Sequence, residues 1–132
     1  MIWYKNLFLI DDDEDDHEFF MDAIKEIDTS IKCSFSFDGE KALGQLQQLK
    51  RSELPNLIIL DTNLPKLTGK QILIELKRDP VLKAIPVVMY STFFAAGDNE
   101  QLMKLGAVHY LAKPSKFDEF KAALMKILQT KW

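Results

Sequence analysis

The chain has 132 residues, a length that predicts a single domain built around one core. Hydrophobic residues make up 47% of it and charged residues 28%, a composition that excludes a disordered chain. Seventeen Lys and Arg residues against 20 Asp and Glu residues give a formal net charge of -3, so we expect no binding to nucleic acid or to an anionic membrane surface.

The apolar runs and the cysteine content indicate in which cellular compartment the protein resides. No run reaches the roughly 20 apolar residues that a membrane span needs, and the first residues lack the apolar stretch of a signal peptide. The one cysteine, Cys33, cannot form an intramolecular disulfide, which suits a reducing environment. We therefore expect a cytoplasmic protein without a membrane segment.

Short apolar runs alternate with helical patterns along the chain, which predicts five strand and helix pairs. The runs predict strands over residues 7–10, 32–37, 57–60, 87–90 and 108–112. Apolar residues at helical spacing follow each run and predict helices around Phe20, Ile24 and Ile27; Ala42, Leu43, Leu46 and Leu49; Ile72, Leu73 and Leu76; Leu102, Met103 and Leu105; and Phe117, Phe120, Leu124, Ile127 and Leu128. Gly106 is expected to end the fourth helix.

This alternation predicts an α/β fold, a doubly wound parallel sheet with helices on both faces. The solid apolar run at residues 57–60 has the form of a strand that is covered on both sides. In such sheets ligands bind beyond the carboxyl ends of the strands, so the residues that follow each run are the candidates for a site.

Polar residues stand at four of these strand ends. They are Asp11 and Asp12 after the first strand, Asp61 after the third, Ser91 and Thr92 after the fourth, and Lys113 after the fifth. Carboxylates from neighbouring strands converge and repel each other by about 4 kcal/mol per pair at a separation of about 4 Å. Oxygen-only ligands that repel each other in this way predict a site for Mg²⁺, Mn²⁺ or Ca²⁺.

The remaining polar groups point to phosphoryl chemistry at that metal. Ser91 offers a hydroxyl and Lys113 an ammonium, the groups that hold a phosphoryl opposite its metal-bound oxygens. Asp61 stands alone on the central strand, between metal and lysine, and is the favoured nucleophile. The residues alone therefore predict phosphoryl transfer to Asp61.

Other polar residues are expected to have structural roles only. Asp13 is expected to cap the first helix, and Cys33 to be a small core residue. His17 and His109 are expected at the surface. The acids of the first helix are expected to form a solvated face; they are Asp15, Asp16, Glu18, Asp22 and Glu26.

The motifs taken together resemble the receiver domain of two-component response regulators. The resemblance rests on residues 9–13, on 60–65 with Gly69 eight residues after Asp61, on 86–91, on Gly106, Ala107 and Tyr110, and on 113–114. Their order and spacing match across essentially the whole chain. Within the family the sequence is most similar to stand-alone receivers, such as those of chemotaxis and those paired with phytochrome-type kinases.

The resemblance implies a flavodoxin-like fold with strand order 2-1-3-4-5, in which residues 1–132 form one receiver domain without an effector domain. It implies that Asp61 accepts a phosphoryl group from a phosphohistidine donor. Asp12, Asp61 and the backbone carbonyl of Asn63 would bind Mg²⁺ directly, with Mn²⁺ as a substitute, and Asp11 would act through water. Lys113 would pair with the phosphoryl, aimed by a cis bond to Pro114.

The same resemblance implies a switch and partners. Ser91 and Tyr110 would move when the phosphoryl forms, with Thr92, Phe93, Pro65, Gly69 and Pro114 as supporting residues. A sensor histidine kinase or a histidine phosphotransfer protein would dock at the first helix, near Asp15, Asp16 and Glu18. A downstream protein or a second copy would bind at the fourth helix, fifth strand and fifth helix, where Lys104, His109, Lys121 and Lys126 form a mildly basic face.

Some features depart from the family pattern, and two other interpretations stay open. Leu64, Thr68 and Phe93 replace commoner residues, which bears on phosphoryl lifetime. A degenerate receiver would be an interaction module that is never phosphorylated, although the retained acids argue against it. A haloacid-dehalogenase-type phosphatase would use residues 11–13, but its expected Thr or Val is Asp15 and no cap domain fits. Magnesium titration separates these classes.

Overall fold

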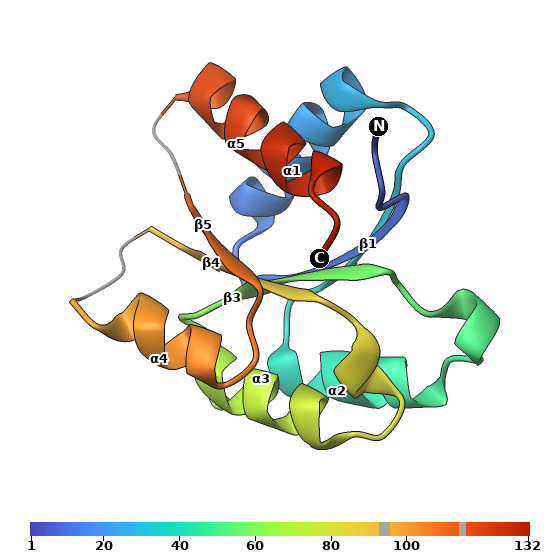
Figure 1. Ribbon diagram of the computed structural model, residues 1–132, viewed down its shortest axis with the longest axis vertical. Coiled ribbons are helices and arrows are strands. Elements are labelled where there is room, and N and C mark those ends of the chain that lie inside the picture. The colour runs from blue at the N-terminus through green and yellow to red at the C-terminus, as the bar shows by residue number, and fades with distance from the viewer. Residues whose placement is uncertain (93–95, 114–115) are drawn as a thin grey trace.

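The computed structural model describes residues 1–92, 96–113 and 116–132 (Figure 1). The strands are β1 (Asn6–Ile10), β2 (Lys32–Ser36), β3 (Leu57–Asp61), β4 (Val87–Ser91) and β5 (His109–Ala112). The helices are α1 (Glu14–Ile27), α2 (Gly39–Gln48), α3 (Gly69–Arg78), α4 (Asp98–Lys104) and α5 (Phe117–Gln129), with short 3₁₀ turns η1 (Arg51–Glu53) and η2 (Leu82–Ala84). The expectations for Phe93 and for the peptide bond to Pro114 lie outside the described residues.

The five strands form one parallel sheet in the order β2-β1-β3-β4-β5, which confirms the predicted topology. The register aligns the strand ends that matter for a site. Ile10 at the end of β1 lies opposite Leu60 of β3, so the next residues of the two strands emerge side by side. Every residue of β3 is buried, as the apolar run at residues 57–60 predicts for a central strand.

Helices cover both faces of the sheet and enclose two apolar cores (Figure 1). On one face α1 and α5 pack together through residues such as Phe20, Ile24 and Phe120. On the other face α2, α3 and α4 cover the strands, with Leu46, Leu73 and Leu102 among the buried residues. The strand alternation and the helical stripes of the sequence account for both layers.

Side-chain caps start three of the helices shortly after the preceding strands. Asp13 accepts hydrogen bonds from the amides of Asp15 and Asp16 at the start of α1, as expected from the sequence. Asp38 caps α2, and Thr68 caps α3. These caps keep the first turns of the helices close to the carboxyl edge of the sheet.

Gly106 follows α4 with a φ of 115°, the left-handed conformation that glycine adopts without steric cost, so it ends the helix as predicted. Within the described ranges, no helix is long and apolar enough to span a bilayer.

Candidate functional site

Three carboxylates converge at the carboxyl ends of β1 and β3. Asp11 is fully buried, Asp61 is 4% exposed and Asp12 is exposed. One oxygen from each lies within 4.8 Å of the others. This convergence is what the pairing of β1 with β3 predicts, and it gathers hard oxygen ligands of the kind that divalent cations prefer.

Lys113, just after β5, brings a positive charge into this cluster. Its Nζ lies 2.9 Å from Oδ2 of Asp61, 2.8 Å from Oδ2 of Asp11 and 2.7 Å from Oδ2 of Asp16. Its backbone N–H donates to the carbonyl of Ser91 at 2.7 Å, which fixes the chain beside β4. Burial alone would lower the pKa of the Lys113 ammonium, but the three carboxylates outweigh burial and raise that pKa above its ordinary value, so the group stays charged.

Asp11 provides a test of whether the cluster fits a metal ion. Its Oδ1 accepts a hydrogen bond from the amide of Asp13, and its buried Oδ2 lies 2.8 Å from the ammonium of Lys113. Burial raises the pKa of the Asp11 carboxyl to about 7, against the opposing effect of Lys113. Three carboxylates, two of them buried, that converge beside a single ammonium fit a divalent cation.

The loop after β3 holds Asp61 in place. Oδ1 of Asp61 accepts from the amide of Asn63 at 2.9 Å, while Oδ2 accepts from Lys113. Gly69, the first residue of α3, packs directly on this strand end: a Cβ at this position would lie 2.2 Å from the carbonyl oxygen of Asp61. Only glycine fits there, so Gly69 lets α3 start against the acceptor strand. Pro65 lies exposed in the same loop.

The two expected switch residues lie at different depths. Ser91, the last residue of β4, is 5% exposed, and Thr92 after it is exposed. Tyr110 on β5 is 41% exposed, and its ring stacks on that of His109 at a centroid distance of 5.3 Å. In this structure the Tyr110 side chain lines a hollow between β5 and α5 of about 390 Å³.

Two residues of α1 are placed differently from the expectation. Asp16 was expected on a solvated face, but its carboxylate is hydrogen-bonded to Lys113. His17 was expected at the surface, but it is 6% exposed and stacks between the rings of Phe35 and Phe37. Its Nε2 lies 2.7 Å from the backbone carbonyl of Asp11, so Nε2 carries the proton and donates it. The spacing of residues within α1 does not predict either of these contacts.

The expected basic face is smaller than the sequence suggested. Lys104 and Lys126 are exposed and His109 is partly exposed. Lys121 instead points to α1, where its Nζ lies 3.2 Å from the carboxylate of Glu26. Lys121 therefore ties α5 to α1 and does not belong to the exposed face.

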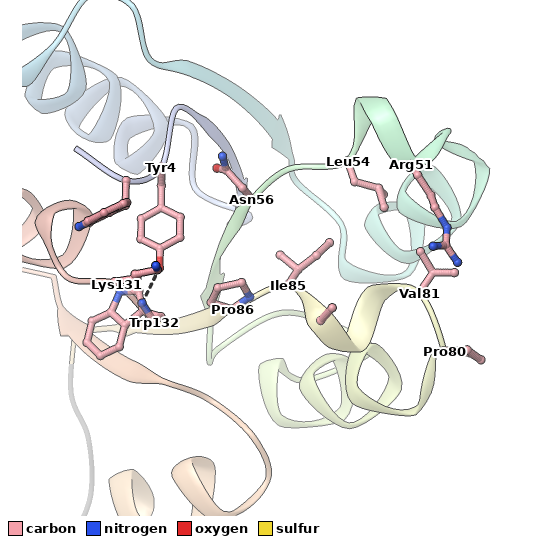
Figure 2. Close-up of a pocket in the computed structure, with 12 residues that line it drawn as sticks. Tyr4, Arg51, Leu54, Asn56, Pro80, Val81, Ile85, Pro86, Lys131 and Trp132 are labelled. Carbon is pink, nitrogen blue, oxygen red and sulfur yellow. Dashed lines mark hydrogen bonds between the residues drawn. The ribbon is translucent and has the colours of Figure 1, made fainter. Parts of the chain in front are cut away.

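A second hollow, of about 550 Å³, lies at the amino ends of the strands, away from the acidic cluster (Figure 2). Trp3, Asn56 and Pro86 line it just before β1, β3 and β4, and Trp132 closes one side, its amide hydrogen-bonded to the hydroxyl of Tyr4. The charged residues that line this hollow are Arg51 and Lys131. None of its lining side chains is a carboxylate, and among the described residues the group of three converging acids lies at the carboxyl ends of the strands.

Comparisons with known proteins agree with this geometry. Residues 7–125 match the response regulator receiver domain family. The chain is 35% identical over 112 residues to the response regulator Rcp1 of Synechocystis sp. (strain ATCC 27184 / PCC 6803 / Kazusa), covering 83% of this chain and 76% of that protein. It is 29% identical over 116 residues to the polar-differentiation response regulator DivK of Brucella anthropi, covering 88% of this chain and 89% of that protein.

Solved structures of similar proteins have the same fold. The phosphorylated cyanobacterial phytochrome response regulator RcpA superposes with a TM-score of 0.83 at 31% identity, over 94% of this chain and 91% of that one. The Mn²⁺-bound form of response regulator Rcp1 superposes with a TM-score of 0.78 at 31% identity, over 97% of both chains.

Proposed function

The chain belongs to the response regulator receiver domain family, and we propose that it accepts a phosphoryl group on Asp61 from a phosphohistidine donor. The observation that carries the proposal is the position of the Asp61 carboxylate. It lies at the end of the central strand, within 4.8 Å of ligand oxygens of Asp11 and Asp12 and 2.9 Å from the Lys113 ammonium. This arrangement places a nucleophile between a metal site and a phosphoryl-binding cation.

In the proposed reaction an oxygen of Asp61 forms a bond to phosphorus. The bond between phosphorus and the donor nitrogen breaks, and its electron pair returns to the imidazole ring of the donor. Lys113 donates a hydrogen bond to one phosphoryl oxygen, and the Ser91 hydroxyl donates a hydrogen bond to another. A divalent ion held by Asp11, Asp12 and Asp61 would supply positive charge that favours transfer. Attack of water on phosphorus later releases inorganic phosphate and restores the carboxylate.

The metal in this proposal is Mg²⁺, with Mn²⁺ as a substitute. Asp12, Asp61 and the backbone carbonyl of Asn63 would bind it directly, and Asp11 would act through a water molecule. Support comes from the convergence of the three carboxylates and from the oxygen-only donor set. The related Rcp1 was solved in an Mn²⁺-bound form, which is consistent with this choice.

The proposed output is a change at β5 and its neighbouring helices. Ser91 would move toward the phosphoryl, and Tyr110 would leave the hollow beside α5 for the space behind Ser91. That exchange would reshape the face that a downstream protein or a second copy contacts. A sensor histidine kinase or a histidine phosphotransfer protein would approach from α1. We place this phosphoryl transfer in the cytoplasm, where Cys33 remains reduced.

Intact-mass spectrometry after incubation with acetyl phosphate tests the proposal. We expect one phosphoryl group per chain with Mg²⁺ and none with a chelator. The Asp61→Asn variant is expected to stay unmodified because an amide is not the required nucleophile. Asp22→Asn, which removes an exposed carboxylate from α1, is the matched control and is expected to be modified like the unchanged protein. Stoichiometric modification of Asp61→Asn would contradict the assignment of the acceptor.

A further inference from the structure

Asp16 connects α1 to the phosphoryl pocket. Its Oδ2 accepts a hydrogen bond of 2.7 Å from Nζ of Lys113, although the two residues are 97 positions apart in the chain. The Asp16 side chain is 28% exposed, whereas the other two partners of Lys113, Asp11 and Asp61, are 0% and 5% exposed. Of the three carboxylates around the ammonium, Asp16 is therefore the one that water can reach.

A phosphoryl group on Asp61 would need the same ammonium. Lys113 has three N–H donors, and it uses them among Asp16, Asp61 and the neighbouring Asp11. A phosphoryl group adds up to two negative charges and three acceptor oxygens beside it. The carboxylate of Asp16 then competes for Lys113 and repels the incoming anion, because both negative groups face one cation.

We propose that Asp16 is a positioning residue that holds Lys113 in the resting pocket and is displaced when Asp61 is phosphorylated. This inference rests on the function proposed above. Asp11 is buried at a strand end and cannot leave, but Asp16 is partly exposed and becomes hydrated when it releases Lys113. The Asp16–Lys113 ion pair stabilises the unphosphorylated state and thereby slows phosphorylation.

The displacement involves no covalent change at Asp16. With acetyl phosphate as the donor, an oxygen of Asp61 bonds to phosphorus, the bond from phosphorus to the acetyl oxygen breaks, and acetate leaves with the electron pair. Asp16 exchanges the hydrogen bond from Lys113 for hydrogen bonds from water. Its effect on the reaction therefore acts entirely through the position of Lys113.

The test compares phosphorylation rates of the unchanged protein and of Asp16→Asn, with acetyl phosphate and with Mg²⁺ saturating for each protein. We expect Asp16→Asn to react about fivefold faster, which corresponds to about 1 kcal/mol of activation free energy. We also expect it to bind beryllium fluoride, a stable phosphoryl mimic, about fivefold more tightly with Mg²⁺ present. Asp16→Glu restores a carboxylate and is expected to react within about twofold of the unchanged protein.

Asp15→Asn is the matched control. It removes the same charge from the adjacent, exposed position of α1, so it reports the general effect of charge near the pocket. With acetyl phosphate, a small donor that needs no protein docked at α1, it is expected to react at the rate of the unchanged protein. A rate increase in Asp16→Asn that exceeds the control supports displacement from Lys113, because a purely long-range charge effect would accelerate both variants equally.

Failure of this inference differs from failure of the proposed function. If the unchanged protein is phosphorylated and Asp16→Asn reacts no faster than Asp15→Asn, the role of Asp16 is wrong and Asp61 remains the acceptor. If Asp16→Asn binds beryllium fluoride no more tightly than Asp15→Asn, the competition for Lys113 is also refuted. If the unchanged protein takes no phosphoryl group with Mg²⁺, the proposed function itself is wrong.

Discussion

His17 fixes the end of β1 from the neighbouring helix. Its imidazole lies between the rings of Phe35 and Phe37, and its Nε2–H donates to the carbonyl of Asp11, the residue that begins the acidic cluster. A buried carbonyl that loses its donor costs about 1–3 kcal/mol. His17 therefore stabilises the backbone from which Asp11 and Asp12 reach the site.

Substitution of His17 separates the hydrogen bond from the packing. His17→Leu keeps apolar contact with Phe35 and Phe37 but leaves the Asp11 carbonyl without this donor, so we expect the free energy of unfolding to fall by about 2 kcal/mol. His17→Gln keeps an N–H donor of similar reach and is expected to lose about 1 kcal/mol or less. Urea unfolding monitored by tryptophan fluorescence measures both. Equal losses in the two variants would show that the hydrogen bond contributes nothing.

The sequence predicts where some site residues lie but not others, because only some positions follow directly from the order of the strands. Asp11, Asp12 and Asp61 could be placed together because each directly follows a strand of a parallel sheet, where position in the sequence determines position in space. Asp16 and the ring contacts of His17 could not, because Lys113 follows β5 and the rings of Phe35 and Phe37 lie on and just after β2, away from α1 in the sequence. Their residue types, an acid and a histidine in an acidic run, indicate a solvated face.

At the scale of elements, the strands and helices could be predicted because their burial follows their sequence periods. β3 is apolar over residues 57–60 and is buried throughout, while β2 alternates and lies at an edge of the sheet. One boundary differs: the sequence predicts a second strand over residues 32–37, but β2 ends at Ser36, two residues before Asp38 caps α2. The position of Tyr110 on the outer side of β5 depends on rotamer choice, which no sequence period determines.

The loop between β3 and α3 contains a strained residue. Lys66 has a φ of 63°, the left-handed conformation that residues with a Cβ adopt at a cost of about 1–2 kcal/mol. Lys66→Gly removes that cost but adds flexibility to the unfolded chain, so we expect a net stabilisation of about 0.5 kcal/mol. Thermal unfolding measures it. Lys70→Gly, in the first turn of α3, is the control and is expected to destabilise by about 1 kcal/mol. Destabilisation by Lys66→Gly would contradict the assigned strain.

At the scale of the whole molecule, the acidic cluster places a stability cost at the carboxyl edge of the sheet. Asp11, Asp12 and Asp61 gather near one partly buried ammonium, so the folded chain holds more negative than positive charge there. Binding of a divalent cation would relieve this repulsion, and any ligand that binds only the folded state raises its stability. The cluster therefore links the stability of the entire domain to metal and to pH.

The pKa of Asp11 determines whether the stability of the domain rises or falls with pH. Burial raises it from 3.8 to about 7 in the folded chain, so the folded state binds a proton more tightly than the unfolded state does. The contribution of Asp11 to stability is fully present below the unfolded pKa and is lost as pH rises through about 7. Between about pH 5 and about pH 8, in chelator, we expect the melting temperature to fall by roughly 5 °C, or about 2 kcal/mol.

Calorimetry of the unchanged protein and of Asp11→Asn, each with chelator and with saturating Mg²⁺, checks this expectation. In chelator, the melting temperature of Asp11→Asn should fall much less between these pH values, because its amide does not titrate. His109, whose pKa is lowered by burial and by Lys126, acts in the opposite direction, but it is present in both proteins and cancels in the comparison. Mg²⁺ requires the ionised Asp11, so it should stabilise the unchanged protein more at the higher pH and flatten its pH profile. Identical pH profiles for the two proteins in chelator would show that Asp11 does not carry the coupling, and that the cost of the acidic cluster is distributed over its other members.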